Sequence, residues 1–213
     1  MKKATLFITL LTFLIGANIM AQDIIELEGK PDLSRGRNIM EAFMDRQSIR
    51  EYNSQELERP ILSALLWSAN GINRPDEKKR TAATASNSQE IDIYVVFPEA
   101  TYFYDAFKNV LELRYKGDLR KAVASGQDFV IDAPLSIIIV GDLDKLRGND
   151  EVKKMQLACM DAGIVSSNIY LYCAGNKLGT VARATMNTEE LSKALKLNKN
   201  QRPILNHPVG YRK

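Results

Sequence analysis

The chain is poor in the residues from which most catalytic and metal centres are built. Its 213 residues include one histidine and two cysteines. His207 lies in an apolar stretch near the C-terminus, where a lone histidine is usually a hydrogen-bonded structural residue. A catalytic triad or a zinc site needs several such side chains in one place. We therefore expect no metal site and no histidine-based catalysis.

Two nucleotide-binding motifs are also missing. The sequence contains neither the Gly-x-Gly-x-x-Gly dinucleotide fingerprint nor a glycine-rich loop ending in Lys-Ser/Thr. Paired carboxylates occur at Asp142/Asp144 and Glu189/Glu190, in loop and helix-start positions where carboxylates face water or cap helices. A glycosidase-type carboxylate pair is therefore disfavoured, and a bound nucleotide would have to be held by another device.

Charge of neither sign dominates. The 29 Lys and Arg residues nearly balance the 26 Asp and Glu residues, which leaves a net charge of +3. Nucleic-acid-binding proteins usually show a basic stripe, and none is visible here. Hydrophobic residues make up 45% of the chain and charged residues 26%, as is typical of globular proteins. The length suits one domain with a sizeable core.

The first 21 residues have the pattern of a cleavable export signal. The positive start Met1-Lys2-Lys3 is followed by the apolar segment Ala4–Ala17, and Ala21 supplies a small residue before Gln22. The apolar segment is shorter than the roughly 20 residues of a membrane-spanning helix, and no cysteine follows it to carry a lipid. We expect an exported protein, periplasmic or extracellular, with no stable membrane anchor after cleavage. The exact cleavage site is left open.

After the signal, residues 22–36 form a polar N-terminal arm and residues 37–213 one domain. Hydrophobic periodicity predicts helices over the following segments: Arg37–Asp45, Pro60–Ala69, Gly117–Ser125, Asp150–Ala174 and Thr188–Leu195. Strand signals occur at these segments: Ile91–Phe97, Thr101–Tyr104, Val110–Tyr115, Leu135–Val140, Leu178–Ala184 and Pro203–Val209. Helices and strands are mixed without strict alternation, which favours an α+β fold with a mostly antiparallel central sheet flanked by helices.

Two details of the helices can be tested directly. Asn70-Gly71 follows the second helix, where we expect glycine in the left-handed cap conformation. The long helix is apolar nearly all round from Leu157 onward, so we expect it to be central and buried. Cys159 and Cys173 both fall in it, about 21 Å apart along the axis, whereas a disulfide needs Cα atoms within about 7 Å. We expect two free, buried thiols.

Cations and small polar groups gather in segments without regular structure. Arg46, Ser48 and Arg50 alternate, and alternate side chains of an extended segment share a face. Two guanidinium groups and a hydroxyl on one face are suited to an anion such as phosphate, although this segment taken alone is better explained as an ordinary solvated turn. Ser86-Asn87-Ser88-Gln89 offers amides that can read the edge of a heterocycle, and Arg212 and Lys213 add two cations at the C-terminus.

Taken together, these segments resemble the FMN-dependent nitroreductase family over residues 37–213. Four blocks carry the resemblance. They are, in order: Arg46-Gln47-Ser48-Ile49-Arg50 after the first helix, Leu65–Pro75, Ala83–Gln89 before a strand, and Asp161-Ala162-Gly163 through Asn168 in the long helix. Their order and spacing are far more specific than any one block.

The resemblance implies a nitroreductase-like α+β sandwich that forms an intertwined homodimer, with FMN bound at the subunit interface. It also implies the residues that bind the cofactor. In the family pattern, the first block holds the phosphate, the ribityl chain and the N1/O2 side of the ring, and Asn87 faces the pyrimidine edge. The backbone at residues 184 and 185 approaches the flavin, and the C-terminal residues close on the phosphate. The implied cofactor-binding residues are Arg46, Gln47, Ser48, Arg50, Asn87, Ala184, Thr185, Arg212 and Lys213.

By the same resemblance we expect an FMN-dependent oxidoreductase. It would pass hydride equivalents from NAD(P)H or another donor to nitro, quinone or related acceptors in a ping-pong cycle. Because the flavin carries the redox chemistry, no catalytic side-chain acid or base is required. Two alternatives remain open: an exported FMN-binding protein with little or no turnover, and a structural protein on the same scaffold. Ala83, Ser167 and Arg212 depart from the family pattern, the first two at positions that bear on substrate contacts.

Overall fold

The computed structural model describes residues 22–29 and 31–213, so the predicted signal lies outside the described residues. Seven strands form one sheet in the order β1-β6-β5-β4-β7-β9-β8, and every neighbouring pair is antiparallel. The strands are β1 (Ile24–Glu26), β4 (Ile91–Val96), β5 (Ala100–Asp105), β6 (Val110–Lys116), β7 (Leu135–Asp142), β8 (Leu178–Thr180) and β9 (Gln201–Tyr211). The α+β prediction with an antiparallel sheet is confirmed.

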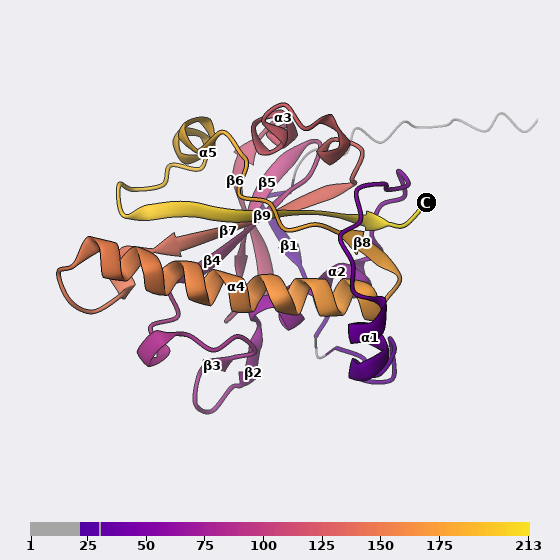
Figure 1. Cartoon of the computed structure of the whole chain (residues 1–213), viewed down its shortest axis with the longest axis horizontal. Helices are drawn as coiled ribbons and strands as arrows, with labels where there is room; N and C mark the ends of the chain where they lie inside the picture. The colour runs from indigo at the N-terminus through magenta and orange to yellow at the C-terminus, as the bar shows by residue number, and fades with distance from the viewer. Residues whose placement is uncertain (1–21, 30) are drawn as a thin grey trace, which may run out of the picture.

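Helices cover both faces of this sheet (Figure 1). One face carries α1 (Ile39–Asp45), α2 (Arg59–Asn70) and α4 (Glu151–Gly175), and the other carries α3 (Arg120–Ala124) and α5 (Thr188–Ala194). Alternation along the strands explains the three layers. In β4, Ile93 and Val95 pack with α2 and α4, whereas Tyr94 and Val96 pack with α3 and α5. The predicted apolar strand at 135–140 is likewise buried on both faces.

The second helix begins with a proline in its first turn and ends at Asn70, as predicted. The prediction for its cap was wrong. Gly71 has φ −76° and ψ 175°, which is extended and not left-handed. Glycine is required there for space, because a Cβ at Gly71 would lie 2.6 Å from the Cα of Trp67.

Residues 71–90, which connect α2 to β4, are polar in composition but contain regular structure. They form a hairpin of β2 (Ile72–Arg74) and β3 (Lys79–Arg80), then the 3-10 turn η1 (Ala85–Asn87). The Arg80 guanidinium donates to Gln89 Oε1 at 3.0 Å and to the Asn70 carbonyl at 2.8 Å. These bonds tie the hairpin to α2 and to the start of β4.

Both ends of the sheet differ from the sequence prediction. The polar arm 22–36 contributes β1, which pairs with β6. At the other edge, β8 ends at Thr180 and does not run on to Ala184, although Arg183 still pairs with Asn206 in an isolated bridge. The interruption lies opposite Pro208, which has no N–H to donate to the ladder.

The long helix α4 begins after Asp150, whose side chain accepts the N–H of Lys153. Within one chain it is buried on one face only, which corrects the expectation of burial all round. Val152, Met160 and Ile164 are 69%, 65% and 38% exposed. Among the described residues, none of the helices combines the length and the apolar character that a membrane-spanning helix needs.

The two thiols are free, as predicted, but they differ in burial. Cys173 is buried, whereas Cys159 is exposed, so the expectation that both are buried was wrong for Cys159. The reason is the phase of the helix: Ala158 and Ala162 face the core, and Cys159 is rotated away from it.

We expect the Cys159→Ser variant to show no native thiol reactivity and one reactive thiol after unfolding. Burial raises the pKa of the remaining Cys173 thiol well above its usual range. In the folded chain a reagent therefore cannot reach Cys173, and the thiol stays protonated and unreactive. Titration with a chromogenic disulfide reagent, with and without denaturant, measures this. The Cys173→Ser variant is the matched control. Rapid native reaction in Cys159→Ser would show that α4 opens locally.

Candidate functional site

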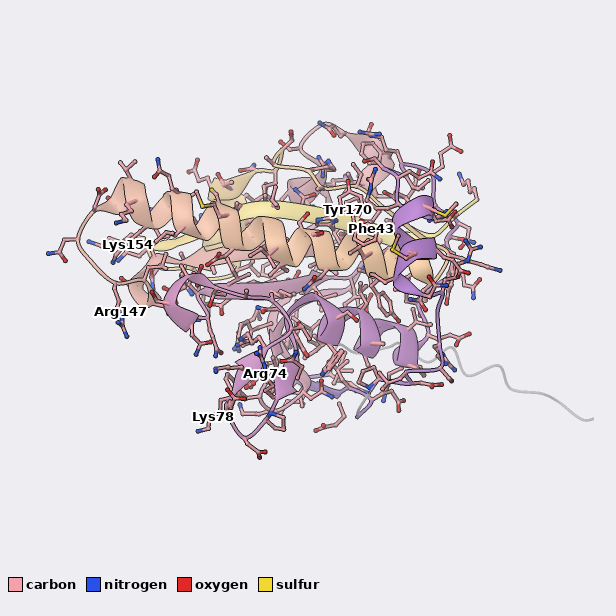
Figure 2. All side chains as sticks on the ribbon, turned by 60° about the horizontal axis from the view of Figure 1, so that its bottom comes forward. Phe43, Arg74, Lys78, Arg147, Lys154 and Tyr170 are labelled. Carbon is pink, nitrogen blue, oxygen red and sulfur yellow. The ribbon has the colours of Figure 1, made fainter. Side chains whose placement is uncertain are left out.

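Tyr170 of α4 contacts two other segments of the chain, one of them more than a hundred residues earlier in the sequence. Its phenol oxygen lies 3.0 Å from Ser48 Oγ and accepts the backbone N–H of Ala182 at 2.8 Å. The guanidinium carbon of Arg46 lies 5.4 Å from the centre of its ring. In Figure 2, Tyr170 lies toward the end of α4 that packs against α1. The site is built around this side chain.

The segment after α1 is extended, and its register follows from the sheet edge. α1 ends at Arg46, where ψ turns to 116°. The Ile49 N–H donates to the Thr180 carbonyl at 2.9 Å. Ile49 also packs on Gly179, where a Cβ would lie 2.6 Å from its Cγ2. With Ile49 turned to β8, Arg46 and Ser48 both reach Tyr170, as their alternation predicted, whereas no contact of the third predicted member, Arg50, places it on this face.

Several polar side chains of this region have no partner that would compete with a ligand. Arg46, Gln47, Arg50 and Lys213 are exposed, and within the described residues no carboxylate or hydrogen-bond acceptor pairs with them. Arg212 differs. Its Nε donates to the Leu178 carbonyl at 3.0 Å, and Nη1 lies 3.6 Å from Asp45, so the C-terminal segment is anchored beside the same edge.

Ala184 and Thr185 follow Ala182 on the same edge, and both are exposed. A buried guanidinium fixes their backbone. Arg183 donates to Asn206 Oδ1 at 2.7 Å and to the Ala124 carbonyl at 2.8 Å. The Asn206 amide in turn donates to the Thr185 carbonyl at 3.1 Å. Burial lowers the pKa of Arg183, and the carbonyls at the end of α3 offset part of that cost.

Asn87 is not brought to this cluster within one chain. It lies in η1, whose Ala85 N–H donates to Asp161 Oδ2 at 2.7 Å. Asp161 precedes Tyr170 by nine residues of the same helix, which separates them by about 13 Å along its axis. Asn87 is exposed, with φ 55°, a left-handed conformation that asparagine adopts more readily than most residues.

A buried carboxyl pair supports η1. The Glu90 side chain is fully buried, its Oε2 accepts from Ser88 Oγ at 3.1 Å, and its Oε1 has no partner among the described residues. Burial and the neighbouring Asp161 carboxylate raise the pKa of Glu90 to about 7. The pair therefore holds a proton that an exposed pair would release.

We expect the wild-type free energy of unfolding to fall by on the order of 1–3 kcal/mol between about pH 4.5 and pH 7. The folded chain keeps the Glu90 proton in this range whereas the unfolded chain releases it, so rising pH favours unfolding. Glu90→Gln should remove most of this dependence. Denaturant unfolding at several pH values tests it, with exposed Glu99→Gln as the matched control. An unchanged pH slope in Glu90→Gln would contradict the assignment.

The remaining titratable groups fit the structural roles predicted for them. His207 is fully buried, its Nε2 lies 2.8 Å from Ser166 Oγ, and its Nδ1 lies 3.0 Å from Thr180 Oγ1. Burial lowers its pKa to about 3, so the ring is neutral. Asp142 accepts the Asp144 N–H at the start of η3 (Leu143–Lys145), and the 189/190 pair lies in the first turn of α5.

Sequence reasoning missed Tyr170. The available signal was a phenol in the long helix, one turn after Ser166. That signal is weak, because its partners Arg46, Ser48 and Ala182 come from two other parts of the chain. Asp161 was quoted as part of a motif, but its role in holding η1 depends on packing.

Comparison with known proteins agrees with this architecture. A crystal structure from Ralstonia eutropha JMP134, described as a candidate nitroreductase, shares 35% identity and a TM-score of 0.83, with 90% of each chain covered. A curated candidate nitroreductase of Methanocaldococcus jannaschii is 27% identical over 199 residues, 88% of this chain and 97% of its own. A nitroreductase family protein of Clostridium difficile 630 is 24% identical with a TM-score of 0.60, covering 83% and 86% of the two chains, and shares the fold.

The sequence profile described as "Nitroreductase family" matches residues 43–211. This range contains the extended segment 46–50, the turn η1, the long helix α4 and the whole of β9. The protein belongs to the nitroreductase family.

Proposed function

We propose that this oxidoreductase is an exported, homodimeric FMN enzyme. It passes hydride equivalents from NAD(P)H or another reduced donor to nitro, quinone or related acceptors in a ping-pong cycle. The observation that carries the proposal is the set of donors around Tyr170: Arg46 and Ser48 both contact its side chain, and no carboxylate of the described residues neutralises Arg46.

These residues fit FMN. Its phosphate accepts hydrogen bonds and carries negative charge, which suits Arg46, Ser48 and the C-terminal cations Arg212 and Lys213. Arg50 supplies a further unpaired cation for the N1/O2 side of the ring, with Gln47 beside it. When bound, FMN supplies the hydride chemistry.

The chain itself binds and orients. The exposed backbone at Ala184 and Thr185 is held by Asn206 and Arg183, so it offers a fixed edge to a planar ring. His207 is buried and neutral, which leaves it no part in proton transfer at the surface. The protein's contribution is therefore placement and charge, with no histidine acid or base involved.

Two observations support a homodimer. Asn87 lies away from the Arg46 cluster within one chain, and a second copy could supply it to the same flavin. Apolar side chains are also exposed on helices of this face, beyond what an isolated chain would present to water. They are Ile39, Met40, Phe43 and Met44 on α1 and Val152, Met160 and Ile164 on α4.

The visible spectrum of the purified protein tests the proposal. We expect a yellow protein with flavin absorption, released as FMN on denaturation, that bleaches on anaerobic addition of NADH or NADPH. Flavin that binds but is not reduced by any donor would favour the alternative, a non-catalytic FMN-binding protein. A protein that stays colourless after incubation with FMN refutes the proposal. Fractionation of producing cells tests the export signal separately.

A further inference from the structure

Tyr170 is the one polar contact that the described residues give to both Arg46 and Ser48. Ser48 Oγ lies 3.0 Å from the phenol oxygen, and the Arg46 guanidinium lies 5.4 Å from the ring centre. Both partner side chains are exposed, whereas Tyr170 is half-buried on a long helix. The long helix therefore supports the exposed side chains of Arg46 and Ser48 through Tyr170.

Either hydroxyl can donate in the 3.0 Å contact between Tyr170 and Ser48, and the bond that Tyr170 already accepts from Ala182 favours Tyr170 as the donor. The phenol oxygen accepts the Ala182 N–H at 2.8 Å and has one proton of its own to donate. Among the described residues, Ser48 Oγ is the acceptor in reach of that proton. When Tyr170 donates to Ser48, the serine proton has no protein partner and points away from Tyr170, toward a ligand.

Among the described residues around Tyr170, the groups that Arg46 and Ser48 turn toward a ligand are donors. The Arg46 guanidinium carries five N–H groups and stacks on the ring, and Ser48 adds one O–H. The neighbouring carboxylate, Asp45, is taken up by Arg37 at 2.9 Å and Arg212 at 3.6 Å. These donors match a phosphate monoester, which only accepts in its dianionic form.

We propose that Tyr170 is a positioning residue for phosphate recognition, acting through the outward-pointing Ser48 hydroxyl and the seated Arg46. This inference rests on the proposed function, because the phosphate it assigns is that of FMN. The inference concerns only the phosphate end of the cofactor, so it can be wrong even if the protein binds FMN.

Riboflavin has the same ring and ribityl chain but no phosphate, so it separates a loss of phosphate recognition from a general loss of flavin binding. Tyr170→Phe keeps the ring under Arg46 and removes only the phenol oxygen. We expect it to weaken FMN binding about tenfold, and riboflavin binding by less than about twofold, as for one charge-assisted hydrogen bond. Tyr172→Phe is the matched control on the same helix, since its phenol donates to the Ile61 carbonyl at 3.1 Å, and should change neither affinity.

A double-mutant cycle shows whether Tyr170 acts through Ser48. We expect Ser48→Ala to lower FMN affinity as Tyr170→Phe does, and the double variant to bind no more weakly than Ser48→Ala alone. Because Ser48 is exposed, this variant also tests the idea if Tyr170→Phe does not fold, which the thermal unfolding of the flavin-free protein reports.

The outcomes are distinct. Unchanged FMN affinity in Tyr170→Phe, or equal losses for FMN and riboflavin, overturns the inference and leaves the proposed function intact. Additive losses in the cycle overturn the route through Ser48. A wild-type protein that binds neither flavin refutes the proposed function and this inference with it.

Discussion

Arg46→Ala should weaken FMN binding by about 1.5–3 kcal/mol, or roughly 10- to 150-fold, the scale of a hydrogen bond to a charged group. Arg46 is exposed, and the Tyr170 ring is its one recorded contact in the described chain, so the substitution removes a donor without breaking a protein ion pair. Fluorescence titration of the flavin-free protein with FMN measures the change. Thermal unfolding of the same flavin-free sample should stay near the wild-type value, because surface substitutions cost little stability.

Two further variants sharpen this result. Arg46→Lys keeps the charge but loses the planar fork, and should fall between wild type and alanine. Arg147→Ala is the matched control. Arg147 is an exposed arginine at the opposite end of α4, where Figure 2 shows it far from Tyr170, so its loss should leave FMN affinity unchanged. If Arg46→Ala binds FMN as tightly as Arg147→Ala does, residues 46–50 are an ordinary solvated turn and not a phosphate-binding segment.

If the proposed homodimer forms through the exposed apolar face of α4, Ile164→Asp should convert it to a monomer, with a dissociation constant raised at least about 100-fold, since an unpaired carboxylate in an apolar interface costs several kcal/mol. Ile164 is 38% exposed in one chain and lies beside Gly163, where a Cβ would meet nothing within 4 Å. Light scattering and sedimentation at micromolar concentration, with FMN present, report the assembly state.

The control for this experiment is a charge change away from the proposed interface. Lys193→Asp on α5 lies on the opposite face of the sheet and should leave the dimer intact. If Ile164→Asp remains dimeric, the subunits associate through another surface. If the wild-type protein is monomeric with FMN bound, the homodimer is wrong and Asn87 cannot come from a partner.

Much of the scaffold was readable from the sequence because its signals are local. The continuous apolar run at 135–140 predicts a strand buried on both faces, and β7 is one. Hydrophobic period and caps predicted α2 and α4 to within about two residues. The shared face of Arg46 and Ser48 was also predictable from the sequence. In an extended backbone every second side chain points to the same side, whatever the segment packs against.

Other features depend on which segments pack together. The arm 22–36 contains β1 because β6 offers it an edge, and the polar loop 71–90 is ordered because Arg80 reaches both Gln89 and Asn70. Pro208 could be read from the sequence, but its place opposite the break after β8 could not, because strand register is set by the sheet as a whole.

The candidate site also combines features set by the local sequence with features set by the tertiary structure. The sequence by itself determined the donor types of the binding segment and their spacing, because those are properties of adjacent residues. Only the tertiary structure decided that Tyr170 joins Arg46, Ser48 and Ala182, and that the turn containing Asn87 is held instead at Asp161, about 13 Å from Tyr170 along the axis of α4. The physical reason is that side chains of one helix meet segments more than a hundred residues away in the chain, and no local period or propensity encodes which segment arrives at which turn.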